Sequence, residues 1–239
     1  MSYRTFFSFQ PGSPIRAILG EIRSVIRYPY LYSIYRKFSN YTMFNYHGYI
    51  QNLLLSKKVK VDGCVIECGT WRGGMIAGFA TILGNKHEYY LFDSFEGLPD
   101  VTEKDGERAL QYQIETKQNP EYGWDNCKAE IGFAQEAMKK SGAKHYKLER
   151  GWFENTVPRF DKSKKIALLH LDGDWYDSIY LCLEHLYDSV AVGGVVIIDD
   201  YTNWDGCTRA VHDFFSKRNL PEKIRQFNNQ ISYFIKAAN

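Results

Sequence analysis

From residue 61 onward, apolar residues gather in short runs that alternate with stretches of helical spacing. The runs are rich in β-branched and aromatic residues and cover 64–68, 89–92, 146–148, 166–171 and 195–198. The stretches between them, at 74–84, 127–141, 177–189 and 207–218, are predicted to be helices. This alternation is typical of βαβ units around a parallel sheet. Because the runs are nearly continuously apolar, without an alternation of apolar and polar positions, we expect a doubly wound α/β fold with helices on both faces of the sheet.

The first 60 residues show helical spacing without strand-like runs. Apolar residues between Ile15 and Ile26 predict one or two helices over 14–38, which Pro29 should break or kink. Another helix is expected over 42–56. At the other end, the apolar runs 224–227 and 231–235 predict a closing hairpin. We therefore expect a helical arm or lid over 1–58 and an α/β domain over 59–239.

One stretch, 100–126, interrupts the alternation. It is polar and contains Gly106, Pro120 and Gly123. A long irregular insertion in a compact domain is more often a functional loop than an accident. We expect an irregular insertion that acts as a loop or lid.

Composition limits the class of protein. The 239 residues are 44% hydrophobic and 24% charged, which fits a globular protein and excludes a disordered or collagen-like chain. The apolar runs are far shorter than the ~20 residues that cross a bilayer, and the N-terminus shows no secretory signal. The five cysteines contain no CxxC pair, which indicates free thiols in a reducing compartment. We expect a cytoplasmic protein.

Charge is balanced overall at +2 but unevenly distributed. Residues 1–60 hold nine Lys and Arg and one acid, Glu21. Such an arm indicates either an anionic partner or a solvated face that packs on the acidic remainder. The small net charge and the lack of a basic stripe elsewhere argue against nucleic acid. We also expect no membrane association, and self-association through the aromatic arm.

The segment Glu67-Cys68-Gly69-Thr70-Trp71-Arg72-Gly73-Gly74 combines a strand end, a glycine-rich turn and a helix start. Glycines let a ligand approach the backbone amides at a helix N-terminus. The spacing GxxxGG differs from the dinucleotide pattern GxGxxG, and a plain tight turn explains it as well. Asp93 ends the next strand, beside Ser94. An acid there suits the two hydroxyls of a ribose, or else serves as a cap.

Acidic residues follow two further strands. Asp172 comes after the strand 166–171, with Asp174 and Asp177 close behind as spare candidate ligands, and Asp199 and Asp200 come after 195–198. If these strands are neighbours, the three carboxylates of Asp172, Asp199 and Asp200 gather at one edge of the sheet. Such a group needs a cation, and all-oxygen ligation points to Mg²⁺ rather than zinc. The alternative is that these acids serve only as caps; we read Asp177 as stabilising a helix N-terminus.

The motifs ECGTWRGG, DSFEGLP, GWFENTVP, LDGDWYDS and GGVVIIDDY together resemble the macrocin O-methyltransferase family (TylF/MycF type) over about residues 40–235. The resemblance implies a class I methyltransferase sheet, mostly parallel and seven-stranded with an antiparallel last strand. It implies S-adenosylmethionine and Mg²⁺ as cofactors and a sugar hydroxyl of a small molecule as acceptor. By the same resemblance, Glu67 to Gly74, Asp93 and Ser94 line the cofactor site, with Asp172 beside it. Asp172, Asp199 and Asp200 bind the metal.

Three further assignments accompany the resemblance. Trp152 follows the third strand, where such folds place the adenine, although a core tryptophan fits the pattern too. Asp172 is the first candidate for a general base and His170 the second, since both share one strand face. His170 stands where the resemblance leads us to expect Arg, and it fits equally as a packed core residue.

Other functions remain open from the sequence. A catechol or phenolic O-methyltransferase fits the metal equally well, although three residues after Asp172 stands Trp175 and not the Lys of catechol enzymes. A non-catalytic nucleotide-binding module is a further alternative. A nucleotide-linked or lipid-linked glycan would suit the basic arm as acceptor.

Overall fold

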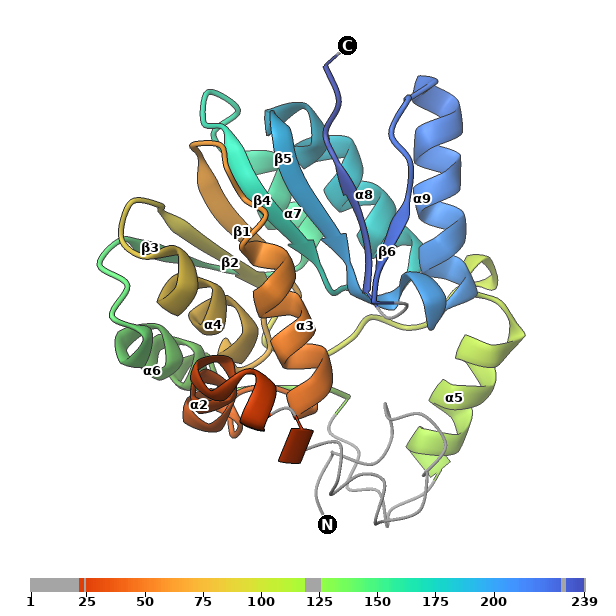
Figure 1. Ribbon diagram of the computed structural model, residues 1–239. Coiled ribbons are helices and arrows are strands. Elements are labelled where there is room, and N and C mark those ends of the chain that lie inside the picture. Colours follow the sequence, from red (N-terminus) through yellow and green to blue (C-terminus); the bar gives the residue numbers. More distant parts are fainter. Residues whose placement is uncertain (1–21, 24, 119–125, 229–230, 239) are drawn as a thin grey trace.

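Within residues 22–23, 25–118, 126–228 and 231–238, which the computed structural model describes, seven strands form one sheet (Figure 1). The strands are β1 (Cys64–Cys68), β2 (Tyr89–Asp93), β3 (Tyr146–Arg150), β4 (Ile166–Leu171), β5 (Val190–Ile198), β6 (Arg225–Phe227) and β7 (Ile231–Ile235). Their order is β3-β2-β1-β4-β5-β7-β6. Strands β1 to β5 run parallel, and β7 pairs antiparallel with both β5 and β6. The predicted mostly parallel seven-stranded sheet is confirmed.

Helices cover both faces of this sheet, as the uninterrupted apolar strands predicted (Figure 1). They are α2 (Pro29–Phe38), α3 (Tyr46–Ser56), α4 (Gly74–Leu83), α5 (Glu107–Gln118), α6 (Ile131–Ser141), α7 (Phe153–Thr156), α8 (Tyr176–Leu186) and α9 (Asp205–Arg218). One apolar core lies under α2, α3, α4 and α6, and a second lies under α8 and α9. Strand β1 serves both cores, because Val65 faces the first and Ile66 the second.

The N-terminal arm joins the first core. Leu31, Ile34 and Phe38 of α2 and Tyr49 of α3 are buried in it together with Phe79 of α4. Pro29 is the first residue of α2, where its fixed φ and missing N–H are tolerated, so the predicted interruption occurs there. Residues 1–21 lie outside the described residues, and the domain boundary near residue 58 stays a prediction.

The expectation of an irregular insertion at 100–126 is wrong, because this stretch contains α5. Within 107–117 of that helix, the buried residues are Ala109, Gln113 and Thr116, at the spacing i, i+4 and i+7. Small and polar residues on the buried face left no apolar period in the sequence. Figure 1 shows α5 standing apart from the sheet, beyond the carboxyl ends of the strands. Residues 119–125 lie outside the described residues.

The strand order creates one place for a ligand. From β1 the chain moves outward through β2 to β3, and from β4 it moves outward in the opposite direction through β5. The reversal therefore lies between β1 and β4, and in open α/β sheets the crevice at such a point binds ligands. No helix among the described residues is long and apolar enough to span a bilayer.

Candidate functional site

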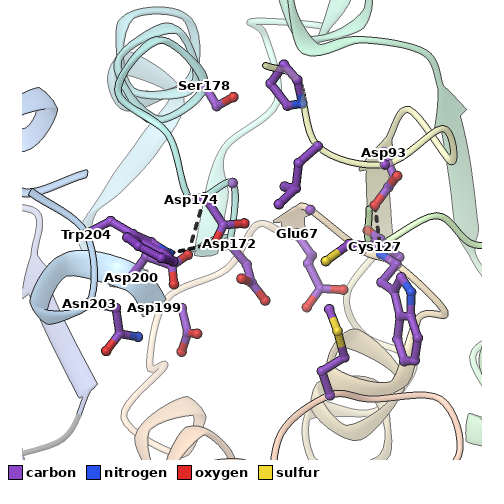
Figure 2. Close-up of a pocket in the computed structure, with 18 of the residues that line it drawn as sticks. Glu67, Asp93, Cys127, Asp172, Asp174, Ser178, Asp199, Asp200, Asn203 and Trp204 are labelled. Carbon is purple, nitrogen blue, oxygen red and sulfur yellow. Dashed lines mark hydrogen bonds between the residues drawn. The ribbon is translucent and has the colours of Figure 1, made fainter. Parts of the chain in front are cut away.

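Three carboxylates meet at the carboxyl ends of β4 and β5 (Figure 2). Asp172 follows β4, and Asp199 and Asp200 begin the 3-10 helix η6 (Asp199–Thr202) that follows β5. One oxygen from each lies within 4.8 Å of the others. Because β4 and β5 are hydrogen-bonded neighbours, the sheet itself brings these loops together.

The electrostatics of this cluster fit a divalent cation. Burial and then repulsion by Asp199 raise the pKa of Asp172 well above its usual value. Burial raises the pKa of Asp199 to about 6, and burial and repulsion by Asp174 raise that of Asp200 well above its usual range. No Lys or Arg is paired with these three among the described residues. A hard cation would offset the repulsion, and carboxylate oxygens are the ligands that Mg²⁺ prefers.

Asp174 contacts the carboxylate cluster through Asp200. It has a left-handed backbone, with φ of 54°, which directs its N–H to Oδ2 of Asp200 at 3.3 Å. Its own carboxylate accepts a hydrogen bond from Nε1 of Trp204 at 2.9 Å, as Figure 2 shows. Burial raises the pKa of Asp174 to about 7. The sequence placed Asp174 only among spare ligands.

The glycine-rich turn lies between β1 and α4, and only part of it faces the cavity. Gly69, Thr70 and Trp71 line the cavity, together with Glu67 at the end of β1. The hydroxyl oxygen of Thr70 and one carboxylate oxygen of Glu67 are buried without a hydrogen-bond partner, which suits groups that await a polar ligand.

The second half of the turn serves the fold. The N–H of Gly73 donates to the carbonyl of Thr70 at 2.8 Å, and that of Gly74 donates to the carbonyl of Tyr41 at 2.8 Å. The guanidinium of Arg72 lies over the ring of Trp71, 4.4 Å from its centroid. Arg72, Gly73 and Gly74 are not in the cavity wall, so their expected contact with a cofactor finds no support in this geometry.

Asp93 ends β2 and holds two loops. Its Oδ2 accepts the N–H of Trp71 at 2.7 Å, and its Oδ1 accepts the N–H of Phe95 at 2.6 Å. Burial raises the pKa of this carboxyl, while backbone hydrogen bonds from Phe95, Trp71 and Thr70 lower it. Asp93 and Ser94 both line the cavity, where the carboxylate is placed to accept a ligand hydroxyl.

Of the two remaining assignments, Trp152 lines the cavity and His170 does not. The side chain of His170 is fully buried, and its Nδ1 lies 3.0 Å from Oε1 of Glu67. A group in that position does not reach an acceptor. Asp177 lies in the first turn of α8, where an acid stabilises the N-terminus of a helix. Its carboxylate also pairs with Lys104.

The acid trio, Asp93 and the first half of the glycine-rich turn open into one cavity of about 1570 Å³. That is larger than the roughly 300–1,000 Å³ typical of a single small-molecule site, so it has room for two ligands. Its outer walls come from α3, from the segment between α2 and α3, and from α5. The sequence did not single out the individual wall residues, among them Phe44, His47 and Tyr112 in these elements and Asn203 and Trp204 after η6.

Comparison with known proteins agrees with this arrangement. The sequence model of the family described as macrocin-O-methyltransferase (TylF) matches residues 43–236. The demethyldecarbamoylnovobiocin O-methyltransferase of Streptomyces niveus is 30% identical over 175 residues, which are 69% of this chain and 62% of that protein. The mycinamicin III 3''-O-methyltransferase of Micromonospora griseorubida is 28% identical over 74% of this chain and 70% of its own length.

Solved structures share the fold. The O-methyltransferase NovP superposes with a TM-score of 0.68 at 25% sequence identity, over 83% of both chains. The chain spans 62% of the length of the novobiocin relative, so that enzyme's activity is not carried over without an argument from the site.

Proposed function

We propose, since the chain belongs to the macrocin-O-methyltransferase (TylF) family, that it is an S-adenosylmethionine- and Mg²⁺-dependent O-methyltransferase. Its acceptor is a hydroxyl of a sugar or of a glycosylated small molecule. The relatives named above carry O-methyltransferase activity on novobiocin and mycinamicin precursors, which supports this acceptor class.

One observation carries the proposal. The trio Asp172, Asp199 and Asp200 shares a single cavity with the buried acid Asp93 and the glycine-rich turn. A metal site alone fits many hydrolases, and a nucleoside site alone fits many binding proteins. A transferase that brings an activated donor to a metal-bound acceptor needs both in one cavity.

The two cofactors would supply distinct chemistry. S-adenosylmethionine would supply a methyl group bound to a sulfonium sulfur, and the neutral thioether that remains after transfer is a good leaving group. Mg²⁺ lowers the pKa of a hydroxyl that it binds and holds a vicinal diol in place. Asp172, Asp199 and Asp200 would hold the metal, and Asp93, Thr70 and Trp152 would hold the donor.

The protein's own part is mainly positioning. Asp93 fixes the turn around Trp71 and orients the ribose, while Trp152 offers a flat face to the adenine. The walls from Phe44 and Tyr112 exclude water from the space between donor and acceptor. Asp172 accepts the hydroxyl proton, because it is the member of the trio that adjoins the glycine-rich turn.

The charge of the cavity favours an acceptor without phosphate. Arg108 is the one Lys or Arg in its described wall, against eleven Asp and Glu residues. That Arg lies 5.4 Å over the ring of Trp204. Lys104 and Lys117 pair with two of these acids, Asp177 and Asp100, and one bound Mg²⁺ would offset two further charges. The acids that remain favour a neutral or cationic glycoside over a nucleotide diphosphate. A glycoside is therefore favoured over a nucleotide-linked or lipid-linked glycan.

The experiment is a methyl-transfer assay with labelled S-adenosylmethionine and a panel of acceptors. The panel contains aminocoumarin and macrolide glycosides, simple methyl glycosides, catechols and nucleotide sugars. We expect transfer to glycosides only, loss in excess EDTA and recovery with Mg²⁺. Transfer to catechols alone would assign the runner-up activity. Binding of S-adenosylmethionine without any transfer across the panel or to water-soluble diols would favour a non-catalytic module.

Self-association and a reducing compartment belong to the same proposal. Ile22, Val25, Ile26 and Tyr30 are exposed on neighbouring turns of the arm, which supports a homo-oligomer that covers them. Four of the five cysteines are buried thiols outside any disulfide, which supports residence in the cytoplasm. Light scattering of the purified protein tests the first point, and the thiol titre under non-reducing conditions tests the second.

A further inference from the structure

A buried polar pair connects β1 to β4 at the floor of the cavity. Glu67 and His170 are paired in the register of the two strands, and Nδ1 of His170 lies 3.0 Å from Oε1 of Glu67. Their side chains are 1% and 0% exposed. Burying polar groups of this kind costs a large desolvation free energy unless they are hydrogen-bonded, so each member of the pair stabilises the other.

The pair is incomplete on the cavity side. Oε2 of Glu67 is buried without a hydrogen-bond partner, yet Glu67 is part of the cavity wall. In Figure 2 the carboxylate of Glu67 lies between Asp93 on one side and Asp172, with Asp199 and Asp200, on the other. An ionised carboxylate only accepts hydrogen bonds, so the missing partner is a donor.

Donors of S-adenosylmethionine fall into three groups: the ribose hydroxyls, the adenine amino group and the α-ammonium. Under the proposed function Asp93 accounts for the ribose hydroxyls, and Trp152 stacks on the adenine ring. Of the two donors that remain, only the α-ammonium is charged, and a charge-assisted bond to a carboxylate is stronger than a bond from a neutral amino group.

We propose that His170 is a positioning residue for cofactor binding, which holds the Glu67 carboxylate so that its free oxygen accepts the α-ammonium of S-adenosylmethionine. This inference rests on the proposed function and deepens it. His170 thereby acts through Glu67 and touches neither donor nor acceptor.

Packing fixes His170 in this role. Its ring meets Phe79 edge-on at 5.5 Å between centroids, and the ring of Phe44 lies 6.2 Å away. With a proton on Nδ1, the His170 ring donates a hydrogen bond to Oε1 of Glu67. Burial raises the pKa of Glu67, and the hydrogen bond with His170 opposes that rise.

The first test compares two replacements of His170 by calorimetry with S-adenosylhomocysteine. His170→Asn keeps a donor near the Nδ1 position, and we expect a dissociation constant within about threefold of wild type. His170→Leu fills the space without a donor, and we expect a constant raised about tenfold or more, as for loss of a hydrogen bond to a charged group. If leucine prevents folding, His170→Phe replaces it with the same expectation.

The second test is a double-mutant cycle with Glu67→Gln. If His170 acts through Glu67, adding His170→Leu to the Glu67→Gln variant changes binding by less than about threefold. Leu169→Ala, on the same strand but in the other core, controls for lost packing and should leave the dissociation constant unchanged while lowering the melting temperature.

The outcomes are distinct. Additive effects in the cycle, or equal binding by the asparagine and leucine variants, overturn the role of His170. Unchanged binding by Glu67→Gln overturns the assignment of Glu67. If wild type itself binds no S-adenosylhomocysteine, the proposed function fails, whereas wild-type binding that the variants share removes only this inference.

Discussion

Gly69 lies against the backbone of Asp172, so closely that a Cβ on Gly69 would stand 1.6 Å from the Asp172 carbonyl oxygen. The N–H of Asp172 also donates to the carbonyl of Cys68 at 2.8 Å. The turn that lines the donor site and the loop that carries the first metal ligand are therefore one packed unit. A change in either displaces the other.

Gly69→Ala tests this contact. Backbone atoms must move to admit the methyl group, and Gly69 has φ of 91°, so we expect a loss of several kcal/mol in unfolding free energy or failure to fold. Gly142→Ala is the matched control, because Gly142 also has a left-handed φ, 83°, but nothing lies within 4 Å of an added Cβ. It should cost only about 1 kcal/mol. Urea denaturation measures both, and equal costs would contradict the close approach.

Asp199→Asn tests the metal trio. Removing one charge from three converging carboxylates weakens Mg²⁺ binding, so we expect methyl transfer to fall about 100-fold or more while S-adenosylhomocysteine binding changes little. The thermal shift that Mg²⁺ produces should also disappear. Asp177→Asn removes an acid from the first turn of α8, where it pairs with the exposed Lys104, and serves as the control. A wild-type response to Mg²⁺ in Asp199→Asn would exclude this residue as a ligand.

The metal-free protein should lose stability as the pH rises. Burial raises the pKa of Asp199 to about 6 and that of Asp174 to about 7, both above the value of an unfolded aspartate. The folded state then binds these protons more tightly, and their contribution, complete below about pH 4, disappears as the pH passes through 6 and 7. Thermal denaturation in EDTA between pH 5 and 8 measures it. Asp199→Asn should flatten the curve, and a wild-type curve that rises with pH contradicts the expectation.

Tyr112→Ala tests the wall that α5 contributes. The ring of Tyr112 lies 5.2 Å from that of Trp204, which in turn hydrogen-bonds Asp174 behind the acid trio. We expect the KM for the acceptor to rise about tenfold with little change in the dissociation constant of S-adenosylhomocysteine, because an aromatic contact of this kind and its burial are lost. Leu110→Ala, on the exposed side of the same helix, should leave both unchanged. A shift in cofactor binding alone would move Tyr112 to the donor site.

Local patterns predicted the elements that the site depends on. The bounds of β1 and β4 follow from runs of mostly apolar residues, because a strand buried on both faces has few polar positions. The exceptions, Glu67 and His170, pair with each other. The acids after β4 and β5 stand out for the same reason, as charges at the point where such runs end. Helix α5 did not stand out in the sequence, because its buried residues, Ala109, Gln113 and Thr116, are small or polar.

The sequence by itself determined that the chain forms a doubly wound sheet with acids at the ends of its strands. The reason is that the hydrophobicity of each residue predicts its burial, and the order of the residues fixes which end of each strand carries the acids. Only the tertiary structure decided the partners. The N–H groups of Gly73 and Gly74 donate to the carbonyls of Thr70 and Tyr41, and His170 contacts Glu67 instead of the cavity. The contact of His170 with Glu67 depends on β1 lying beside β4, about 100 residues apart in the chain. No local pattern records which distant strand becomes a neighbour.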